Sequence, residues 1–320
     1  MVVGTSWHLH DPTTTASSGG FMPRPFRFGV NLLTLVTGPA WREKCRRAEE
    51  LGYDVLLVPD HLGWPSPFPA LVAAAEATER PRVGTFVLNA GFWNPALLAR
   101  EVATTDALTG GRLELGLGTG YVKDEHDAAG LPFGTPGRRV DHLEHTIREL
   151  DRLLGDPGQL PKAVQQPRPP LLIGGNGPRM LRLAARHAEI AAFTGARQAP
   201  GRPEGTLELL PAEQVAASVA AYAAYEERAA DRTGPAERNI LVQQVLVTDD
   251  RRAAAREFVA HGAGIDEEQA LEVPTLLIGT PAQMAEQLRE HRERHGFSYI
   301  TVLDRFLEAF APVLEELKGS

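Results

Sequence analysis

Residues 83–121 read VGTFVLNAGFWNPALLAREVATTDALTGGRLELGLGTGY, and this stretch decides the fold. Residues 83–90 form a short apolar run, which is typical of a buried strand. Residues 94–111 have a proline just inside a helical pattern and end on two glycines, which predicts a helix. Residues 112–120 are again strand-like. A strand, a helix and a strand in this order predict one unit of a parallel sheet.

The same alternation continues on both sides of this stretch. Eight strand-then-helix units predict an α/β protein, a (β/α)8 TIM barrel with insertion loops at the C-terminal mouth. An open doubly wound sheet is the main alternative. The remaining predicted strands are 26–31, 53–60, 169–177, 189–193, 239–247 and 299–304, and the remaining clear helices are 40–52, 138–154 and 178–188.

The chain organisation predicts one barrel domain over residues 26–320, preceded by a polar, flexible extension over residues 1–25. The net charge is -8, which argues against a nucleic-acid or anionic-membrane partner. No apolar run approaches the roughly 20 residues that span a bilayer. The only cysteine, Cys45, allows no disulfide framework, so we expect a cytoplasmic protein.

The tip of the second strand delivers Asp60, His61 and Trp64 directly after an apolar run. Parallel barrels place their chemistry at the carboxyl ends of the strands. Imidazole can donate or accept a proton near neutral pH, and indole can pack against a planar ring. The alternative is that Asp60 caps the next turn and that His61 is an ordinary loop residue.

Two further strand tips carry polar or flexible residues. Asn89 ends the third strand, and Phe92 and Trp93 follow it; these residues could equally form a turn and cover the rim. Gly116, Gly118 and Gly120 let a ligand approach the backbone, but their spacing is not the dinucleotide fingerprint, and 121–127 does not read as an immediately opening helix. The charged run 123–127 is typical of a solvated face, although the glycines before it favour one carboxylate facing a ligand.

The segment LLIGGNGPRML, residues 171–181, has the composition of an anion cradle. Its glycines free the backbone after a strand, and Pro178 starts a helix whose first N–H groups point back at the loop. We predict phosphate binding there, with a tight glycine turn as the alternative. The histidines lack the paired spacing of a zinc site, so no metal is expected. No G-x-S-x-G element is present either, so the sequence offers no serine nucleophile of that type.

Together and in this order, the segments RAEELGYDVLLVPDH, VGTFVLNAGFWNPALLAREVATTDALTGGRLELGLGTGY, DAAGLPFGTPGRRVDHLE and PPLLIGGNGPRMLRLAA resemble the luciferase-like flavin monooxygenase superfamily. They more closely resemble its branch of actinobacterial oxidoreductases that use the deazaflavin coenzyme F420. The resemblance covers about residues 26–304 and implies a barrel whose mouth holds the isoalloxazine-like ring.

The resemblance also implies roles for individual residues. His61 would relay a proton, Trp64 and Phe92 would shape the substrate space, and Glu125 matches a carboxylate common across the branch. Phe86 and Val87 match a strand-three bulge that often holds a cis peptide against the ring. The implied cofactor-binding residues are Asp60, His61, Phe86, Val87, Asn89, Thr119, Gly120, Asp124, Gly174, Gly175, Asn176 and Gly177.

Three features depart from the branch. Tyr121 follows GTG where sugar-phosphate dehydrogenases of the branch have a glutamate, and Trp64 lies one residue nearer His61. The segment 154–169 is shorter than in relatives. The first two departures argue against sugar-phosphate oxidation, and the short segment predicts an unusually open mouth, because that loop helps cover it in relatives.

The resemblance therefore predicts an oxidoreductase that transfers a hydride between coenzyme F420 and a small organic substrate, by reducing an activated C=C or C=N bond or by oxidising an alcohol. His61, Trp64 and Glu125 are the predicted catalytic residues. One alternative is an FMN-dependent monooxygenase that uses O2 and reduced flavin from a partner reductase. A second alternative is a non-catalytic flavin-binding barrel. A homodimer formed through a barrel helix face is a family-level expectation.

Overall fold

The structure is a computed structural model that describes residues 24–34, 36–202, 206–229, 232, 234–261 and 264–318. The extension predicted for residues 1–25 lies outside this part of the chain, apart from Arg24 and Pro25. The assignment of residues 26–320 to one domain stays a prediction.

The main sheet is a closed parallel barrel, with strand order β3-β2-β1-β13-β10-β7-β6-β5-β4 and a further pairing of β3 with β5. β3 and β4 together occupy one strand position, or stave, of the barrel, so the barrel has eight staves. The predicted (β/α)8 barrel is confirmed, and the open sheet is wrong. The barrel strands are β1 (Arg27–Asn31), β2 (Val55–Val58), β3 (Arg82–Thr85), β4 (Leu88–Asn89), β5 (Leu113–Gly118), β6 (Leu171–Gly174), β7 (Ile190–Phe193), β10 (Glu237–Val242) and β13 (Phe297–Leu303).

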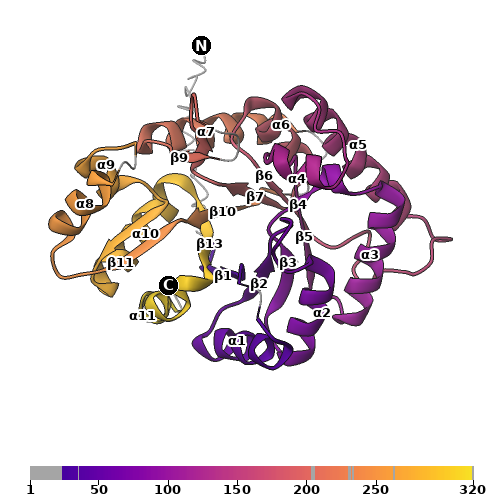
Figure 1. Ribbon diagram of the computed structural model, residues 1–320, viewed down its shortest axis with the longest axis horizontal. Coiled ribbons are helices and arrows are strands. Elements are labelled where there is room, and N and C mark those ends of the chain that lie inside the picture. Colours follow the sequence, from indigo (N-terminus) through magenta and orange to yellow (C-terminus); the bar gives the residue numbers. More distant parts are fainter. Residues whose placement is uncertain are drawn as a thin grey trace, which may run out of the picture.

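The helices surround the strands in an outer ring (Figure 1). Most of them pack an apolar stripe against the barrel; in α1, for example, the buried residues are Trp41, Cys45 and Ala48, on one face of the helix. The helices are α1 (Gly38–Leu51), α2 (Pro67–Ala77), α3 (Pro95–Leu108), α4 (Lys123–Ala128), α5 (Pro136–Leu154), α6 (Pro178–His187), α7 (Ala212–Glu226), α8 (Arg251–Ala260), α9 (Glu267–Glu272), α10 (Pro281–His295) and α11 (Leu307–Leu317), with short 3-10 turns η1 (Ala90–Phe92) and η2 (Asp304–Phe306).

The barrel interior contains an ion network near the amino ends of the strands. Arg27 of β1 pairs with Glu114 and Glu237, and Arg82 donates from Nε to Glu114 at 2.8 Å. The Arg27 guanidinium also lies over the Tyr299 ring, 4.1 Å from its centroid. These charges lie near the amino ends of the strands, where barrel residues serve stability. The opposite, carboxyl end is left for the site.

One local feature is confirmed, and two others differ from the sequence prediction. A cis peptide bond joins Phe86 and Val87, as the resemblance implied, and it divides the strand predicted over 83–90 into β3 and β4. The strand predicted over 239–247 breaks at Gln243, and its second half, β11 (Gln244–Val247), pairs with β12 (Leu276–Gly279) outside the barrel. The run 123–127, read as unlike an opening helix, forms α4.

Two additions decorate the barrel. β11 and β12 share a separate apolar cluster with α8 and α9, which form the orange lobe at the left of Figure 1. The predicted loop over 194–211 contains an antiparallel hairpin of β8 (Ala196–Gln198) and β9 (Leu207–Leu209). Because the hairpin follows β7, it stands at the carboxyl end of the barrel, where Leu207 reaches the cavity described below.

Candidate functional site

A cavity of about 390 Å³ opens at the carboxyl ends of the barrel strands. Its walls come from the last residues of the strands or the residues directly after them, because parallel strands deliver these positions to one rim. The volume falls within the range of small-molecule sites. The lining residues are Asn31, Leu33, Pro59, Asp60, His61, Trp64, Phe86, Val87, Leu88, Asn89, Gly118, Thr119, Gly120, Tyr121, Glu125, Gly174, Gly175, Ala192, Thr194, Leu207, Leu241, Gln243 and Leu303.

His61 and Glu125 form a hydrogen-bonded pair on one side of this cavity. The distance from His61 Nδ1 to Glu125 Oε1 is 2.8 Å. A carboxylate only accepts, so Nδ1 carries the proton and the neutral imidazole presents the lone pair of Nε2. The ring is framed by Trp64 at 4.7 Å and Tyr121 at 5.6 Å, both edge to face. The arrangement fixes one tautomer and one orientation of a group that can move a proton.

Asp60 ties the second stave to the third. Its Oδ2 accepts a hydrogen bond from the backbone N–H of Asn89 at 3.2 Å and one from Trp93 Nε1 at 2.9 Å. Burial raises the pKa of the Asp60 carboxyl above its ordinary value of 3.8, and the bonds from Trp93 and Asn89 oppose the rise. Asp60 thus lines the cavity while holding the rim in place.

Asn89 is oriented by a buried histidine that the sequence did not single out. Asn89 Nδ2 donates to His126 Nε2 at 2.9 Å, and Asn89 Oδ1 accepts from the Gly91 N–H at 3.0 Å. His126 is 1% exposed, and its Nδ1 lies 3.2 Å from the Pro132 carbonyl oxygen, to which it donates. The expected solvated face over 123–127 is therefore wrong for His126, which lies on the buried face of α4.

Small residues line the β5, β6 and β7 side of the cavity. A Cβ at Gly118 would lie 2.7 Å from Val87 Cγ2, and one at Gly174 would lie 3.8 Å from Val87 Cγ1. Ala192 completes this side. The glycines therefore let the Phe86–Val87 bulge enter the barrel and leave a flat floor in front of it, which suits a planar ring.

The loop after β6 leads directly into α6. Gly177 is the N-cap residue and makes no side-chain cap, so the first N–H groups of α6 keep the orientation that binds an anion. Asn176 points elsewhere, because its Nδ2 donates to Thr194 Oγ1 and to the Ala196 carbonyl oxygen, both at 2.7 Å. Gly174 and Gly175 line the cavity, whereas Asn176 and Gly177 do not.

Most of the predicted site residues meet in this cavity, and a few do not. Asp124 is exposed on α4 outside the lining, and Phe92 packs on His126 with ring centroids 5.0 Å apart. The sequence analysis missed Asn31, Gln243 and Leu303. Their signal was position alone, since each ends a strand or follows one.

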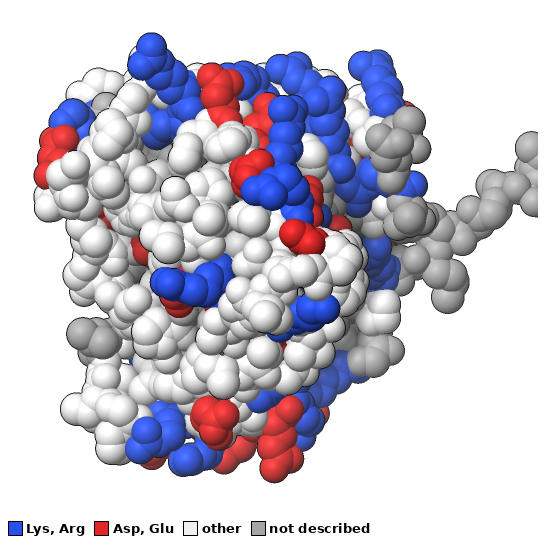
Figure 2. All heavy atoms as spheres, turned by 90° about the vertical axis from the view of Figure 1, so that its right-hand side faces the viewer, with Lys and Arg blue, Asp and Glu red and all other residues white. Residues whose placement is uncertain are grey.

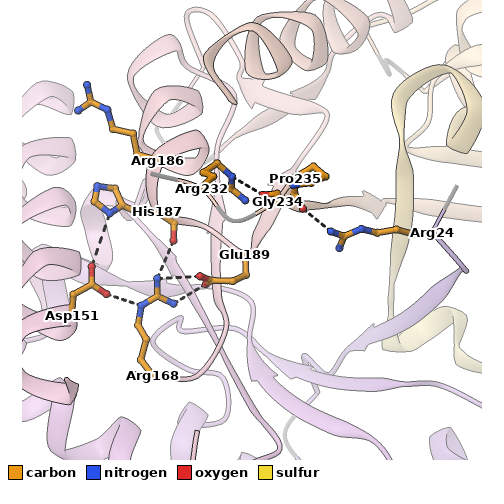
Figure 3. Close-up of a pocket in the computed structure, with 9 residues that line it drawn as sticks. All are labelled: Arg24, Asp151, Arg168, Arg186, His187, Glu189, Arg232, Gly234 and Pro235. Carbon is orange, nitrogen blue, oxygen red and sulfur yellow. Dashed lines mark hydrogen bonds and ion pairs between the residues drawn. The ribbon is translucent and has the colours of Figure 1, made fainter. Parts of the chain in front are cut away.

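A second cavity lies at the opposite, amino-terminal end of the barrel (Figure 3). Its Arg168 donates to Asp151 at 2.6 Å, to Glu189 at 2.7 Å and to the His187 carbonyl oxygen at 3.0 Å. Figure 3 shows this guanidinium enclosed by its partners, while Arg186 points away. Asp151 and Glu189 compensate the charge of Arg168, and the cavity lies at the structural end of the barrel.

Two searches of the described residues gave negative results. Within the described ranges, no three His, Cys, Asp or Glu side chains cluster closely enough to hold a metal ion. None of the helices in this part of the chain combines the length and apolar character that crossing a membrane requires.

Comparison with known proteins places this geometry among known folds. A family model described as luciferase-like monooxygenase matches residues 25–299. The chain is 33% identical over 189 residues to the F420-dependent glucose-6-phosphate dehydrogenase of Intrasporangium calvum, covering 52% of this chain and 56% of that relative. The chain thus spans little more than half the length of this curated relative.

Solved structures show the same fold. A monooxygenase from Streptomyces bottropensis is 22% identical with a TM-score of 0.69, covering 91% of this chain and 99% of that one. An F420-dependent secondary alcohol dehydrogenase, solved in complex with an F420-acetone adduct, is 17% identical with a TM-score of 0.70, covering 92% of this chain and 100% of that one.

Proposed function

Because the chain belongs to the luciferase-like monooxygenase family, we propose that it is an oxidoreductase that transfers a hydride between coenzyme F420 and a small organic substrate. The reaction reduces an activated C=C or C=N bond or oxidises an alcohol. The observation that carries the proposal is the His61–Glu125 pair, whose second imidazole nitrogen is available at a cavity of about 390 Å³. The relatives whose names include F420 support the choice of cofactor.

The residues of the cavity fit the deazaflavin. Phe86 and Val87 would lie against its ring, next to Gly118 and Gly174, where a Cβ would meet Val87. Asn89, Thr119 and Gly120 would line its polar edge, and Gly174, Gly175 and the start of α6 would receive its phosphate. Asp124, Asn176 and Gly177 do not line the cavity, so we propose that they do not contact the ring.

The bound deazaflavin supplies hydride exchange at one ring carbon. The protein supplies the proton and the orientation. In alcohol oxidation, His61 Nε2 would take the hydroxyl proton while the hydride of the alcohol carbon passes to the cofactor. In reduction, the protonated His61 would donate a proton to the substrate atom that does not receive the hydride. Glu125 holds the imidazole and stabilises its protonated form, and Trp64 and Tyr121 shield it from water.

The test is the variant His61→Ala, assayed with enones, imines and alcohols through the absorbance of oxidised F420. We expect turnover to fall about a hundred-fold or more while F420 binding stays within a few-fold of wild type. Turnover equal to that of an active wild type would contradict the proposed relay, whereas F420 binding without turnover in either protein would favour the non-catalytic barrel.

The competing function is an FMN-dependent monooxygenase, which the family description and the Streptomyces structure keep open. It requires reduced flavin from a partner reductase and consumes O2. An oxygen electrode separates the two functions, because hydride transfer from the deazaflavin leaves the oxygen concentration unchanged.

We also propose that the enzyme is a cytoplasmic homodimer. The cytoplasm suits a chain whose single cysteine, Cys45, is buried and free. Figure 2, which views the right-hand side of Figure 1, shows a broad, mostly uncharged area that a few charged side chains interrupt, with more charges gathered above and below it. Among the exposed apolar side chains of α3 are Leu97 and Leu108, at 52% and 59% exposure.

The dimer prediction is tested with Leu97→Glu and Leu108→Glu together. Two carboxylates on an apolar interface should convert the dimer to a monomer in sedimentation velocity. The far-ultraviolet circular dichroism spectrum should stay unchanged. The matched control, Leu160→Glu, alters a leucine on the loop after α5 that is 76% exposed. A wild-type protein that sediments as a monomer would contradict the proposal.

A further inference from the structure

One wall of the mouth cavity carries no ionisable group. It is formed by β1, β10, β13 and the residues directly after them, and its side chains are Asn31, Leu33, Leu241, Gln243 and Leu303. Two carboxamides therefore stand among three leucines. A wall of this composition suits a compound with an apolar body and one or two hydrogen-bonding groups.

The whole lining is poor in positive charge. Its carboxylates are those of Asp60 and Glu125, and no lysine or arginine contributes to it, although every lysine and arginine of the chain lies among the described residues. Arg305 approaches the wall only from behind the backbone: its Nη2 donates to the Gln243 carbonyl oxygen at 2.9 Å, and its guanidinium lies over Phe306. An anionic substrate would lose its hydration there and find carboxylates without a cation.

Asn31 is the buried polar residue on this wall whose side-chain oxygen has no hydrogen-bond partner in the described part of the chain. Its side chain is 5% exposed, and its Oδ1 has no hydrogen-bond partner among the described residues. A buried acceptor left unpaired is costly, and Asn31 belongs to the cavity lining, where a bound ligand can supply the missing hydrogen bond. Because a carboxamide carries an acceptor and two donors, it can bind either a hydroxyl or a carbonyl group.

Resting on the function proposed above, we infer that the substrate is an uncharged organic compound. Its apolar body packs on Leu33, Leu241 and Leu303, and its hydroxyl or carbonyl group is hydrogen-bonded by Asn31. Asn31 is thus a specificity-determining residue on the side of the cavity opposite the small residues that face the ring. A phosphate or carboxylate on the substrate is excluded because, with the start of α6 taken by the cofactor phosphate, the rest of the described lining offers two carboxylates and no lysine or arginine.

The first experiment compares two probes on the full-length wild-type protein loaded with F420. The probes are 2-cyclohexenone and its carboxylated analogue 3-oxocyclohex-1-ene-1-carboxylate, titrated through the fluorescence of the bound F420. We expect the uncharged enone to bind at least about ten-fold more tightly. Equal or tighter binding of the carboxylate, or binding of neither probe, overturns the inference.

A separate F420 titration without probe keeps the two claims distinguishable. If F420 itself fails to bind, the proposed function fails. If F420 binds and the probes behave contrary to expectation, only the substrate inference fails.

The second experiment replaces the unpaired amide in Asn31→Leu. We expect enone binding to weaken about ten-fold, since one hydrogen bond is lost. The F420 dissociation constant should change less than about two-fold, and the thermal midpoint should not fall, because a buried unpaired group is removed. Enone binding as tight as in wild type would overturn the assignment, and Asn31→Ala provides the same test if the leucine variant does not fold.

Asn239→Leu is the matched control. Asn239 is also a fully buried barrel asparagine with an unpartnered Oδ1, but it lies outside the cavity lining. Its Nδ2 donates to the Tyr299 carbonyl oxygen at 3.1 Å and to Thr301 Oγ1 at 2.8 Å. This variant should lower the thermal midpoint and leave enone binding unchanged. A loss of enone binding equal to that of Asn31→Leu would show a general structural effect and overturn the specific role.

Discussion

The imidazole of His61 depends on one carboxylate for its orientation. The Nδ1–Oε1 distance of 2.8 Å fixes the ring, so Glu125→Gln should disturb the proton relay without emptying the cavity. We expect kcat to fall about ten-fold or more, with KM nearly unchanged, because the lost interaction serves the transition state.

The pH profile of kcat provides the second readout for Glu125→Gln. A neutral amide stabilises the imidazolium less than a carboxylate does, so the profile should differ in shape from that of wild type. Glu144→Gln, on the surface of α5, is the control. An unchanged profile and rate in Glu125→Gln would show that the pair has no role in the reaction.

Asp60 makes a specific contribution to the pH dependence of stability. Burial raises its pKa in the folded protein above 3.8, so the folded state binds more protons than the unfolded state in the window between these values. Stability from this group is therefore fully present below 3.8 and is lost as the pH rises through the raised value.

The variant Asp60→Asn isolates this contribution. Urea unfolding across that window should show the free energy of unfolding of wild type, minus that of Asp60→Asn, decreasing as the pH rises and levelling off above the window. A difference that increases with pH would contradict the raised pKa.

At the residue scale, the sequence predicted the groups that carry recognisable chemistry. His61, Trp64 and Glu125 line one cavity, although their catalytic roles stay predictions. It did not predict His126 or Asn31, because their importance comes from burial and from the presence or absence of partners. Neither property is visible in a short motif.

Among the elements, β3 and β5 approach so closely that one position must be glycine. A Cβ on Gly116 would lie 2.0 Å from the Thr85 carbonyl oxygen, and the Thr85 hydroxyl already bridges the Gly116 N–H and C=O at 2.8 Å each. Gly116→Ala should therefore destabilise the protein by at least about 3 kcal/mol in urea unfolding.

Gly137→Ala is the control for this prediction. Gly137 lies in the first turn of α5, where an added Cβ would meet its nearest neighbour, Arg179 Nη1, at 3.6 Å. Alanine favours a helix over glycine, so stability should stay equal or rise slightly. Equal stability of the two variants would contradict the close approach of β3 and β5.

Element types could be predicted from the alternation of apolar runs and helical patterns, but the interruptions could not. The run 239–247 reads as one strand, yet its chain leaves the barrel at Gln243 and pairs β11 with β12. The partner strand lies 32 residues or so away in sequence, and local propensity contains no information about such pairing. The hairpin of β8 and β9 was read as a loop for another reason, because each of its strands has only three residues and the segment is rich in glycine and proline.

For the whole molecule, the single cysteine reports on global unfolding. Cys45 lies on the buried face of α1 and is 0% exposed, and burial raises the pKa of its thiol to about 12. Its reaction with a thiol reagent at neutral pH should therefore be slow in the folded protein and should reach the rate of a free thiol in denaturant. Rapid reaction under native conditions would contradict the packing of α1 on the barrel.

The closed barrel itself was predictable because its pattern repeats around the whole chain. Eight repeats of strand and helix leave few topologies open, and right-handed crossovers place every strand end on one rim. This is why candidate residues far apart in sequence, such as His61 and Gly174, could be assigned to one mouth before their distance was known.

The most direct test of the account is a parallel titration of the purified full-length protein with coenzyme F420 and with FMN, followed by fluorescence. The account predicts a dissociation constant of about 1 μM or lower for F420 and binding of FMN at least about ten-fold weaker. Tighter binding of FMN, or binding of neither, would contradict the claim that the mouth of this barrel is built for hydride transfer with the deazaflavin.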